Sequence, residues 1–222
     1  MKQFHNCIFN KSLNEGSFPS KWKDCNLTPV FKADQKDIVS NYRGIALLPI
    51  LSKVLERHVH TRLYHHVTDF LNINQHGFRQ HRSCVTQLLQ IFVHTIAKSL
   101  DAGIQTDVIY LDMANAFDKV PHEKLLYKLE MVGVRGQLLA WFRSYLTNRR
   151  HRTVIEGYTS NWRYVPSGVP QGSIIGPLLC LIFINDIAVN ISADTNIPLY
   201  YSTNCNTIQN MVMMLSISVI RR

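Results

Sequence analysis

The sequence has no long apolar run and no apolar leader. A transmembrane helix needs about 18 or more mostly apolar residues in a row. The longest candidate, residues 174–184, is shorter and is interrupted by Gly176 and Pro177. The first residues, M-K-Q-F-H-N-C, lack the apolar region of a signal peptide. We therefore expect an intracellular protein that is neither secreted nor inserted in a membrane.

Closely spaced cysteines are also missing. The chain has five cysteines and no C-x-x-C pair among them: Cys7, Cys25, Cys84, Cys180 and Cys205. An odd number of scattered cysteines argues against a disulfide framework, so we expect reduced thiols. The histidine-rich segment 58–66 has no cysteines at zinc-finger spacing. Exposed histidines on a helix are therefore favoured over a zinc site.

Acidic residues are scarce relative to basic ones, with 15 Asp and Glu against 24 Lys and Arg and a net charge of +9. Such an excess predicts a polyanionic partner. Residues 135–163 contain six arginines and a single acid, interleaved with tryptophan, tyrosine and phenylalanine. Arginine contacts phosphates and aromatic rings stack on bases, so we assign Arg149, Arg150 and Arg152 to nucleic-acid binding. The same aromatic residues also fit the core side of an amphipathic helix.

The chain is long enough, and with 46% hydrophobic residues apolar enough, to bury a core in one or two domains. Residues 108–111 are typical of a buried strand, and Asp112 follows directly. A carboxylate there is costly unless a cation meets it, and a metal ion is a common solution. An Asp–Arg pair is the structural alternative. Phe117 and Asp118 come next, and then Pro121 at the expected start of a helix.

Further elements follow from periodicity and turn residues. The pattern predicts a strand that ends at Lys32, and a helix that follows Arg43 after a short apolar segment. Two more helices are expected near residues 123–132 and 137–149, and a hairpin around Gly157.

A loop rich in glycine and proline, S-G-V-P-Q-G-S, occupies residues 167–173. Glycine in such a loop permits another backbone, or a substrate, to approach closely. Ser173 is expected to cap an apolar helix over residues 174–187.

Four segments together resemble the motifs of one enzyme family. They are N-Y-R-G-I-A-L-L at 41–48, Q-H-G-F-R-Q-H-R-S at 75–83, Y-L-D-M-A-N-A-F-D-K-V-P-H at 110–122 and G-V-P-Q-G-S at 168–173. In order and spacing the chain is similar to the reverse transcriptases of non-LTR (LINE-like) retrotransposons. Gly44 departs from the proline that is usual there. A group II intron or maturase-like reverse transcriptase is the alternative relative.

The resemblance implies an α+β protein made of the fingers and palm subdomains of a right-hand polymerase, with the thumb absent. The expected divisions are an N-terminal remnant (1–21), fingers (22–104), an incomplete palm (105–210) and a truncated tail (211–222). The implied activity is RNA-directed DNA synthesis. The implied partners are an RNA template, a DNA primer and a deoxynucleoside triphosphate, and the implied cofactor is Mg²⁺ or Mn²⁺.

The resemblance also implies residue roles in catalysis and template binding. Asp112 and the backbone carbonyl of Met113 would bind metal. Phe117 would lie under the sugar and exclude a 2′-hydroxyl. Arg79 and Arg82 would contact the template, although both could equally serve as caps or ion pairs.

The remaining implied roles concern the incoming nucleotide. Lys32 and Arg43 would hold the triphosphate, which suits the need for cations at developing negative charge. Gln171 and Gly172 would shape the base pair as it forms.

The family's second group of metal-binding acids is missing. Relatives carry two adjacent aspartates, usually Y-A-D-D or F-A-D-D, on a hairpin after the segment F-I-N-D-I at 183–187; here no adjacent carboxylates follow. Three registers are open. Residues 201–204 are the motif with both acids replaced, or residues 193–195 are the motif with one acid missing. The third and favoured register has the hairpin deleted between a strand at 199–200 and a helix at 203–210.

Losing a carboxylate from a two-metal site removes most catalysis, because positioning and charge stabilisation are nearly all that the protein supplies. Asp194 is a poor substitute, and hydroxyl or amide oxygens are weak ligands for Mg²⁺. We therefore expect a catalytically inactive member with an incomplete metal site. A non-enzymatic nucleic-acid-binding remnant is the alternative description of its present role.

Overall fold

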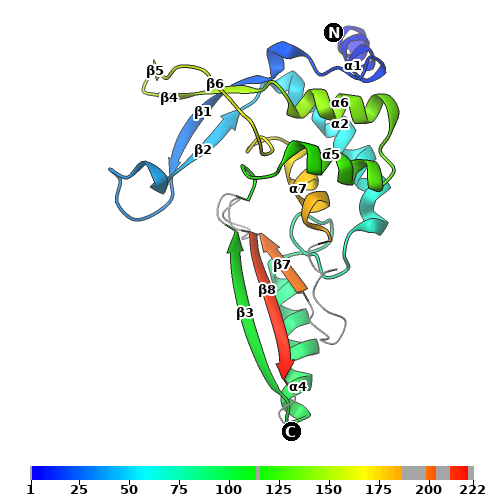
Figure 1. Cartoon of the computed structure of the whole chain (residues 1–222), viewed down its shortest axis with the longest axis vertical. Coiled ribbons are helices and arrows are strands. Elements are labelled where there is room, and N and C mark those ends of the chain that lie inside the picture. Colours follow the sequence, from blue (N-terminus) through cyan, green and yellow to red (C-terminus); the bar gives the residue numbers. More distant parts are fainter. Residues whose placement is uncertain (1, 114–115, 187–198, 204–210, 220–222) are drawn as a thin grey trace. The chain divides into compact units, whose positions relative to one another are not determined.

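The computed structural model describes residues 2–113, 116–186, 199–203 and 211–219. Each of its two compact units combines two stretches of chain. The first unit joins Met1–Thr68 to Phe117–Phe183, and the second joins Asp69–Ala116 to Ile184–Arg222 (Figure 1). The two units are described separately below. The predicted division into fingers and palm stays a prediction.

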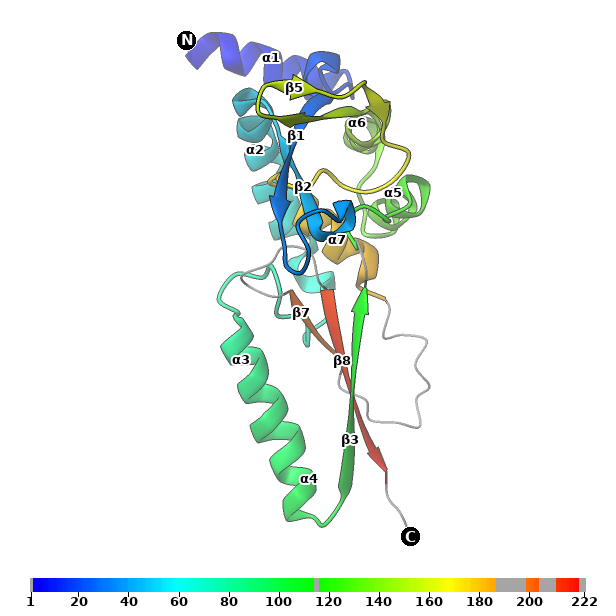
Figure 2. The same cartoon turned by 90° about the vertical axis from the view of Figure 1, so that its left-hand side faces the viewer.

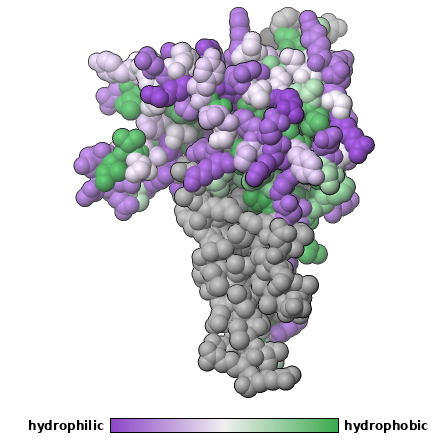
Figure 3. Space-filling view, viewed as in Figure 1, coloured by the Kyte–Doolittle hydropathy of each residue, from purple (hydrophilic) through white to green (hydrophobic). Residues whose placement is uncertain are grey.

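Helices make up most of the first unit. They are α1 (Lys2–Asn14), α2 (Ile50–Val67), α5 (His122–Met131), α6 (Gly136–Leu146) and α7 (Gly176–Ile184), with 3₁₀ turns at Ser20–Trp22 and Val39–Asn41. Helix α7 is apolar on all sides, as expected of a helix surrounded by protein, and its residues Leu178 and Leu179 are almost completely buried. Lys128 of α5 donates a hydrogen bond to the Phe183 carbonyl of α7. Hydrophilic side chains cover most of the visible face of this unit (Figure 3).

Aromatic rings form the centre of the first unit. Trp141, Phe142 and Tyr145 project from the buried face of α6. Phe18 packs edge-on against Trp141 and Tyr145, with ring centroids 5.5 and 5.0 Å apart. The indole Nε1 of Trp141 donates to Ser12 Oγ of α1 at 3.0 Å, so its polar group is satisfied inside the core. These contacts pack helix α6 against α1 and against Phe18, which lies in the loop after α1.

A five-stranded sheet completes the first unit. Its strands are β1 (Asp24–Phe31), β2 (Tyr42–Leu47), β4 (Arg150–Ile155), β5 (Tyr158–Thr159) and β6 (Arg163–Tyr164). Their order is β2-β1-β4-β5, and β6 also pairs with β4. Strand β1 is antiparallel to β2 and parallel to β4.

The register gives this sheet two chemically different faces, because side chains alternate along a strand. Cys25 pairs with His151, and Leu27 pairs with Ala46, so these four share one face. The opposite face carries Asp24 beside Arg150 and Asn26 beside Arg152. One face is therefore mainly apolar and the other is charged.

The second unit contains a three-stranded antiparallel sheet and a helical segment. The strands β3 (Gln105–Met113), β7 (Leu199–Thr203) and β8 (Met211–Val219) lie in the order β3-β8-β7. The helical segment, α3 (Cys84–Leu89), a π-helix (Gln90–Ala97) and α4 (Lys98–Asp101), runs alongside this sheet (Figure 2), and a 3₁₀ turn spans Thr68–Phe70. Ser83 begins α3 with a capping box, in which its hydroxyl accepts from Thr86 N.

Several predicted elements are confirmed. The helices expected near 123–132 and 137–149 are α5 and α6, and the hairpin around Gly157 is β4 paired with β5. Its two turn residues, Glu156 and Gly157, both have positive φ, as a tight hairpin turn requires. Residues 211–222, predicted as a tail, contain strand β8.

The prediction that every cysteine is a reduced thiol was wrong for Cys84. Cys7, Cys25 and Cys180 are free, but Cys84 is disulfide-bonded. Spacing along the sequence does not reveal which distant segments a fold brings together, which is why the bond was missed. Cys205 lies outside the described residues. No helix in the described part of the chain is long and apolar enough to cross a membrane.

Replacing Trp141 by alanine tests the aromatic core. The side chain is fully buried, so Trp141→Ala should lower the free energy of unfolding by about 3–5 kcal/mol. Urea denaturation followed by circular dichroism measures the change. Tyr127→Ala, on the exposed side of α5, is the matched control and should stay within about 0.5 kcal/mol of the unchanged protein. Equal effects at the two positions would contradict the assignment of the core.

Candidate functional site

Residues 167–173 form a loop, here called the glycine loop, that is anchored on one side to the chain just before α5. Gly168 N donates to the Val120 carbonyl and Val169 N donates to the Phe117 carbonyl, both at 2.8 Å. His122 Nε2 donates to the Gly168 carbonyl at 2.8 Å. These bonds satisfy backbone groups that would otherwise be buried without partners. They also fix the position of Phe117, whose side chain is almost completely buried.

Gly168 is required by the closeness of this contact. Its φ is +91°, and a β-carbon there would lie 2.7 Å from both Cα and the carbonyl oxygen of Asp118. Backbone atoms cannot yield at that distance as a flexible side chain can. The Ser167 hydroxyl donates to the same Asp118 carbonyl at 2.9 Å. The glycine predicted to permit close approach does so here toward the protein's own backbone.

The other end of the glycine loop is anchored to strand β2. Ala46 N donates to the Gln171 carbonyl at 2.9 Å. Gly172 has a φ of +104°, and a β-carbon there would lie 2.8 Å from the Ala46 carbonyl oxygen. Gln171 is therefore held at a defined distance from the strand that carries Arg43.

A buried carboxylate contacts the residue that follows the glycine loop. Glu56 of α2 accepts from Ser52 Oγ and from Ile174 N, each at 2.8 Å. Burial raises the pKa of Glu56, and these hydrogen bonds only partly oppose the effect. The predicted cap is also present, because Ser173 Oγ accepts from Gly176 N at 2.9 Å. The sequence analysis missed Glu56, since an acid inside an amphipathic helix is usually solvent-exposed.

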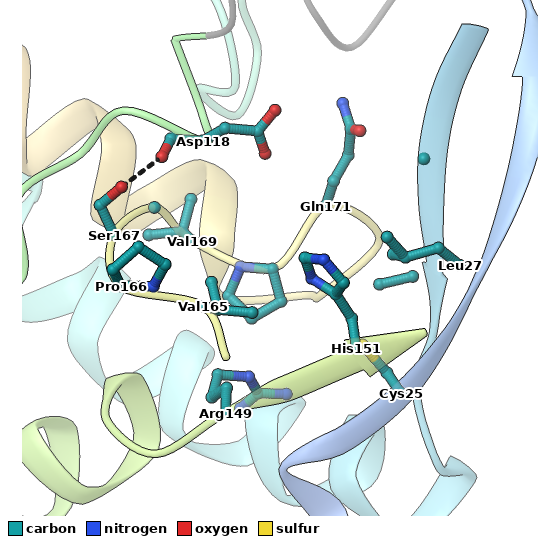
Figure 4. A pocket seen from close by; sticks show the side chains of 14 residues that line it. Cys25, Leu27, Asp118, Arg149, His151, Val165, Pro166, Ser167, Val169 and Gln171 are labelled. Carbon is teal, nitrogen blue, oxygen red and sulfur yellow. Dashed lines mark hydrogen bonds between the residues drawn. The ribbon is translucent and has the colours of Figure 1, made fainter. Parts of the chain in front are cut away.

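A cavity of about 330 Å³ lies between the glycine loop and the mainly apolar face of the five-stranded sheet (Figure 4). The sheet contributes Cys25, Leu27 and His151, and the loop contributes Val169 and Gln171. The cavity is large enough for a small planar ligand and is lined by both apolar and polar groups.

The titratable side chains that line this cavity include Asp118 and His151. Burial raises the pKa of Asp118, and the nearby charges of His151 and Lys32 partly counteract this effect. Burial lowers the pKa of His151, and the charge of Asp118 partly counteracts that effect. The Asp118 carbonyl accepts from the Ser167 hydroxyl at 2.9 Å, which favours a local structural role for this residue.

The two cations predicted to hold a triphosphate both belong to the β1–β2 hairpin. Lys32 directly follows β1, and its Nζ donates to the Ser40 carbonyl at 3.5 Å. Arg43 is half-buried and pairs in register with Val30, on the sheet face opposite the cavity. Both residues belong to one hairpin, and their contact with a triphosphate stays a prediction.

The arginines predicted to contact nucleic acid differ in their surroundings. Arg149 is 2% exposed and donates to the Tyr145 carbonyl at 3.0 Å, with its guanidinium over the Tyr145 ring. Its burial favours a structural role over the predicted contact with nucleic acid. Arg150 and Arg152 lie on the charged face of the sheet, half-buried. The sequence alone did not show that Arg149 differs from Arg150 and Arg152. Arg149 directly precedes β4, and only the packing around the start of this strand decides that its side chain is buried.

Arg79 and Arg82 hold the chain that precedes α3. Arg79 donates to the Asn72 carbonyl at 2.9 Å, and Arg82 donates to the carbonyls of Ile73 and Gln75. Both side chains are thus engaged with backbone oxygens of the second unit. This corresponds to the structural alternative, and their contact with a template stays a prediction.

Asp112 and Met113 end strand β3 of the second unit. In the register of the sheet, Asp112 pairs with Val212 of β8, and Val212 pairs with Ser202 of β7. Strand β7 covers the predicted strand at 199–200, but Thr203 belongs to this strand and not to the predicted helix. Residues 204–210 and the alternative register at 193–195, including Asp194, lie outside the described residues.

The strands that pair with β3 carry no carboxylate in their sequence. Residues 199–219 contain no Asp or Glu. Mg²⁺ sites in proteins are built on carboxylates. Within the described residues, no group of three or more His, Cys, Asp or Glu side chains is placed to hold a metal ion.

Comparison with solved structures defines the class of fold. The structure of telomerase from Candida albicans, in complex with a fragment of telomeric RNA, aligns with 96% of this chain and 42% of that chain, with a TM-score of 0.57 at 12% sequence identity. This likeness shows an α+β fold of the right-hand polymerase class, as the sequence predicts.

The chain belongs to the reverse transcriptase (RNA-dependent DNA polymerase) family, whose model matches residues 31–208. It is 34% identical over 188 residues to the RNA-directed DNA polymerase from mobile element jockey of Drosophila melanogaster, covering 83% of this chain and 20% of the relative. A probable RNA-directed DNA polymerase from transposon BS of the same fly is 32% identical, covering 89% of this chain and 23% of the relative. The resemblance to non-LTR retrotransposons is confirmed. The chain spans about a fifth of the length of these relatives.

A pair of glycines tests the close approach at the glycine loop. Gly168→Ala places a methyl group 2.7 Å from Asp118, whereas Gly157→Ala has a similar φ of +87° and nothing within 4 Å. Both variants carry the strain of positive φ, so the difference between them isolates the clash. Gly168→Ala should lower the free energy of unfolding by about 1–3 kcal/mol more than Gly157→Ala, measured by urea denaturation. Indistinguishable midpoints would show that the loop does not pack on Asp118.

The raised pKa of Glu56 predicts a pH dependence of stability. The folded protein binds this proton more tightly than the unfolded chain does, so the free energy of unfolding should fall as pH rises from the ordinary pKa of 4.5 through the raised one. The steepest slope is about 1.4 kcal/mol per pH unit. Denaturation curves between pH 4 and 8 should show this component in the unchanged protein and not in Glu56→Gln. Glu123→Gln, at an exposed ion pair with Arg143, should leave it intact; loss of the component in both variants would point to another group.

Proposed function

We propose that this chain binds nucleic acid and a nucleoside triphosphate through the surfaces of a reverse transcriptase, without transferring nucleotides. The family uses divalent metal ions and copies RNA templates. In this chain the sequence retains the residues proposed to bind nucleotide and template, but it lacks the adjacent aspartates that would bind the metal ions. The proposal therefore separates binding, which is retained, from chemistry, which is lost.

The observation that carries the proposal is the composition of the strands beside Asp112. The register Asp112–Val212–Ser202 sets the β7–β8 pair next to the strand that ends in the first acid. Residues 199–219 contain no carboxylate. One carboxylate and neutral oxygens do not supply the charge that holds two Mg²⁺ or Mn²⁺ ions. In the proposal Asp112 and the Met113 carbonyl are the remnant of the metal site.

Nucleotide binding is proposed for the β1–β2 hairpin and the glycine loop. Lys32 and Arg43 share one hairpin and suit a triphosphate, because cationic side chains form charge-assisted hydrogen bonds with phosphate oxygens. Gln171, anchored through its carbonyl to Ala46, would contact the base pair together with Gly172. The ring of Phe117 is almost completely buried, which argues against the predicted contact with the sugar. The DNA primer and the deoxynucleoside triphosphate are inferred as ligands from the resemblance to the family.

An active polymerase in which another acid replaces the missing pair is the second candidate. Asp194 is the only carboxylate after Asp186, and a lone acid favours inactivity. A group II intron or maturase-like origin has less support than a mobile-element origin, because the jockey and BS relatives are more than 30% identical over most of the chain.

Primer extension on an RNA template tests the loss of chemistry. The unchanged protein should give no extension with Mg²⁺ or Mn²⁺. The double variant Thr203→Asp with Asn204→Asp introduces two adjacent acids in the first of the three registers, Y-A-D-D at 201–204, which is used because Thr203 belongs to strand β7 and not to the helix of the favoured register. It should gain extension by more than about a thousandfold, because a bound metal ion supplies several kcal/mol of charge stabilisation.

The controls separate the possible outcomes. Adding Asp112→Ala to the double variant should abolish the gained activity. Extension by the unchanged protein that disappears in Asp112→Ala would overturn the proposed loss of chemistry. Binding of a fluorescent primer–template is measured in parallel by anisotropy, and absence of any salt-sensitive binding would overturn the proposed retention of nucleic-acid binding.

A further inference from the structure

The charged face of the five-stranded sheet, opposite the cavity of Figure 4, carries a tryptophan between two arginines. The guanidinium carbon of Arg152 lies 4.7 Å from the centroid of the Trp162 ring, and that of Arg150 lies 5.4 Å away. Both distances are within the range of a cation–π contact. Trp162 is 39% exposed, so the ring is held by its neighbours yet reaches solvent.

Strand β1 fixes both guanidinium groups. Arg150 donates to the Asp24 carboxylate through Nε at 2.9 Å and Nη2 at 2.5 Å, and this pair lowers the pKa of Asp24. Arg152 Nε donates to Asn26 Oδ1 at 2.9 Å. Among the described residues, neither terminal nitrogen of Arg152 has a protein acceptor. A pre-positioned guanidinium with available donors is suited to a phosphate.

A second aromatic ring is placed beside the first. Tyr164 of β6 pairs in register with Arg150, which puts its side chain on the same face of the sheet. It is 72% exposed. Exposed aromatic rings among arginines are suited to bases that are not already stacked in a duplex.

A polar cavity of about 450 Å³ adjoins these rings and shares Arg150 and Tyr164 with them. Its other charged groups are Lys21, Lys23 and Asp24. The Asp24 carboxylate is already paired with Arg150, and the nearly buried Lys23 donates to Ser144 Oγ. The exposed Lys21 therefore leaves the cavity with an excess of positive charge. A phosphate group fits both the sign of this charge and the polar lining.

We infer that this face binds single-stranded nucleic acid, with bases stacked on Trp162 and Tyr164 and phosphates contacted by Arg152 and the lysine-lined cavity. The inference rests on the proposed function, since it names the site at which an unpaired stretch of template would be held. Duplex is disfavoured, because paired bases present no free ring face to these side chains. An acidic protein would match the charge but would leave the exposed rings without a specific partner.

Fluorescence anisotropy with a labelled 12-nucleotide oligouridine tests the inference. Trp162→Ala should weaken binding about fivefold to a hundredfold, the range expected for one lost base–aromatic stack. The slope of log Kd against log salt for Trp162→Ala should equal that of the unchanged protein, because no phosphate contact is lost. Arg152→Ala should weaken binding and also reduce the slope of log Kd against log salt by about one, because one phosphate contact is lost.

Matched variants remove similar groups elsewhere. Tyr127→Ala deletes an exposed ring on α5, and Arg57→Ala deletes an exposed charge on α2. Both should leave oligouridine binding within about twofold of the unchanged protein, since neither residue lies on the sheet. Losses equal to those of Trp162→Ala and Arg152→Ala would overturn the inference and indicate diffuse electrostatic binding.

Tryptophan fluorescence gives an independent readout. Trp141 is fully buried and Trp22 is half-buried, so the measurement uses a Trp22→Phe background, in which quenching by bound oligouridine should come mainly from Trp162. Trp162→Phe should keep most of the affinity, because a ring remains, but should lose the quenching. Quenching that persists in Trp162→Phe would overturn the stacking model.

Two comparisons separate this inference from the proposed function. If a blunt primer–template duplex binds while oligouridine does not, the sheet site is overturned and the proposed function stands. If neither binds, the proposed function fails as well. Competition by polyglutamate as strong as that by oligouridine would overturn the assignment to nucleic acid and favour an acidic protein partner.

Discussion

The arrangement of the first unit depends on backbone contact at the two ends of the glycine loop. Gly168 and Gly172 each approach another segment so closely that a β-carbon would lie under 3 Å from backbone atoms. Hydrogen bonds to Phe117, Val120 and Ala46 accompany these approaches. Such contacts tolerate no side chain and little displacement, because neither partner is flexible. The loop thereby joins the β1–β2 hairpin to the chain that leads into α5.

The packing beneath the glycine loop buries the carboxylate of Glu56, which is unfavourable for its charged form. A buried acid is unfavourable unless its oxygens are hydrogen-bonded, and here Ser52 and Ile174 supply the donors. The start of α7 gains a partner for a backbone N–H group that has none within the helix. The Glu56 carboxylate and the chain at the start of α7 therefore satisfy each other's hydrogen-bonding groups. This explains how a helix with apolar residues on every side begins at a defined position.

The two faces of the five-stranded sheet differ in their chemistry. The mainly apolar face closes the cavity beside Gln171, and the charged face carries Trp162 between Arg150 and Arg152. Both follow from one register, since a shift of a single residue would exchange the faces. In the second unit, the register of β3, β8 and β7 sets Asp112 in line with Val212 and Ser202.

The sequence by itself determined the family, the fold class and the main helices, because short motifs and periodicity are local properties. Only the tertiary structure decided that Arg149 is enclosed while Arg150 and Arg152 line an outer face, and that Glu56 lies in the core. It also revealed the contacts of Arg150 and Arg152 with the Trp162 ring and the bonded state of Cys84. Burial and strand register arise from contacts between residues far apart in the chain. A reading along the sequence does not contain them.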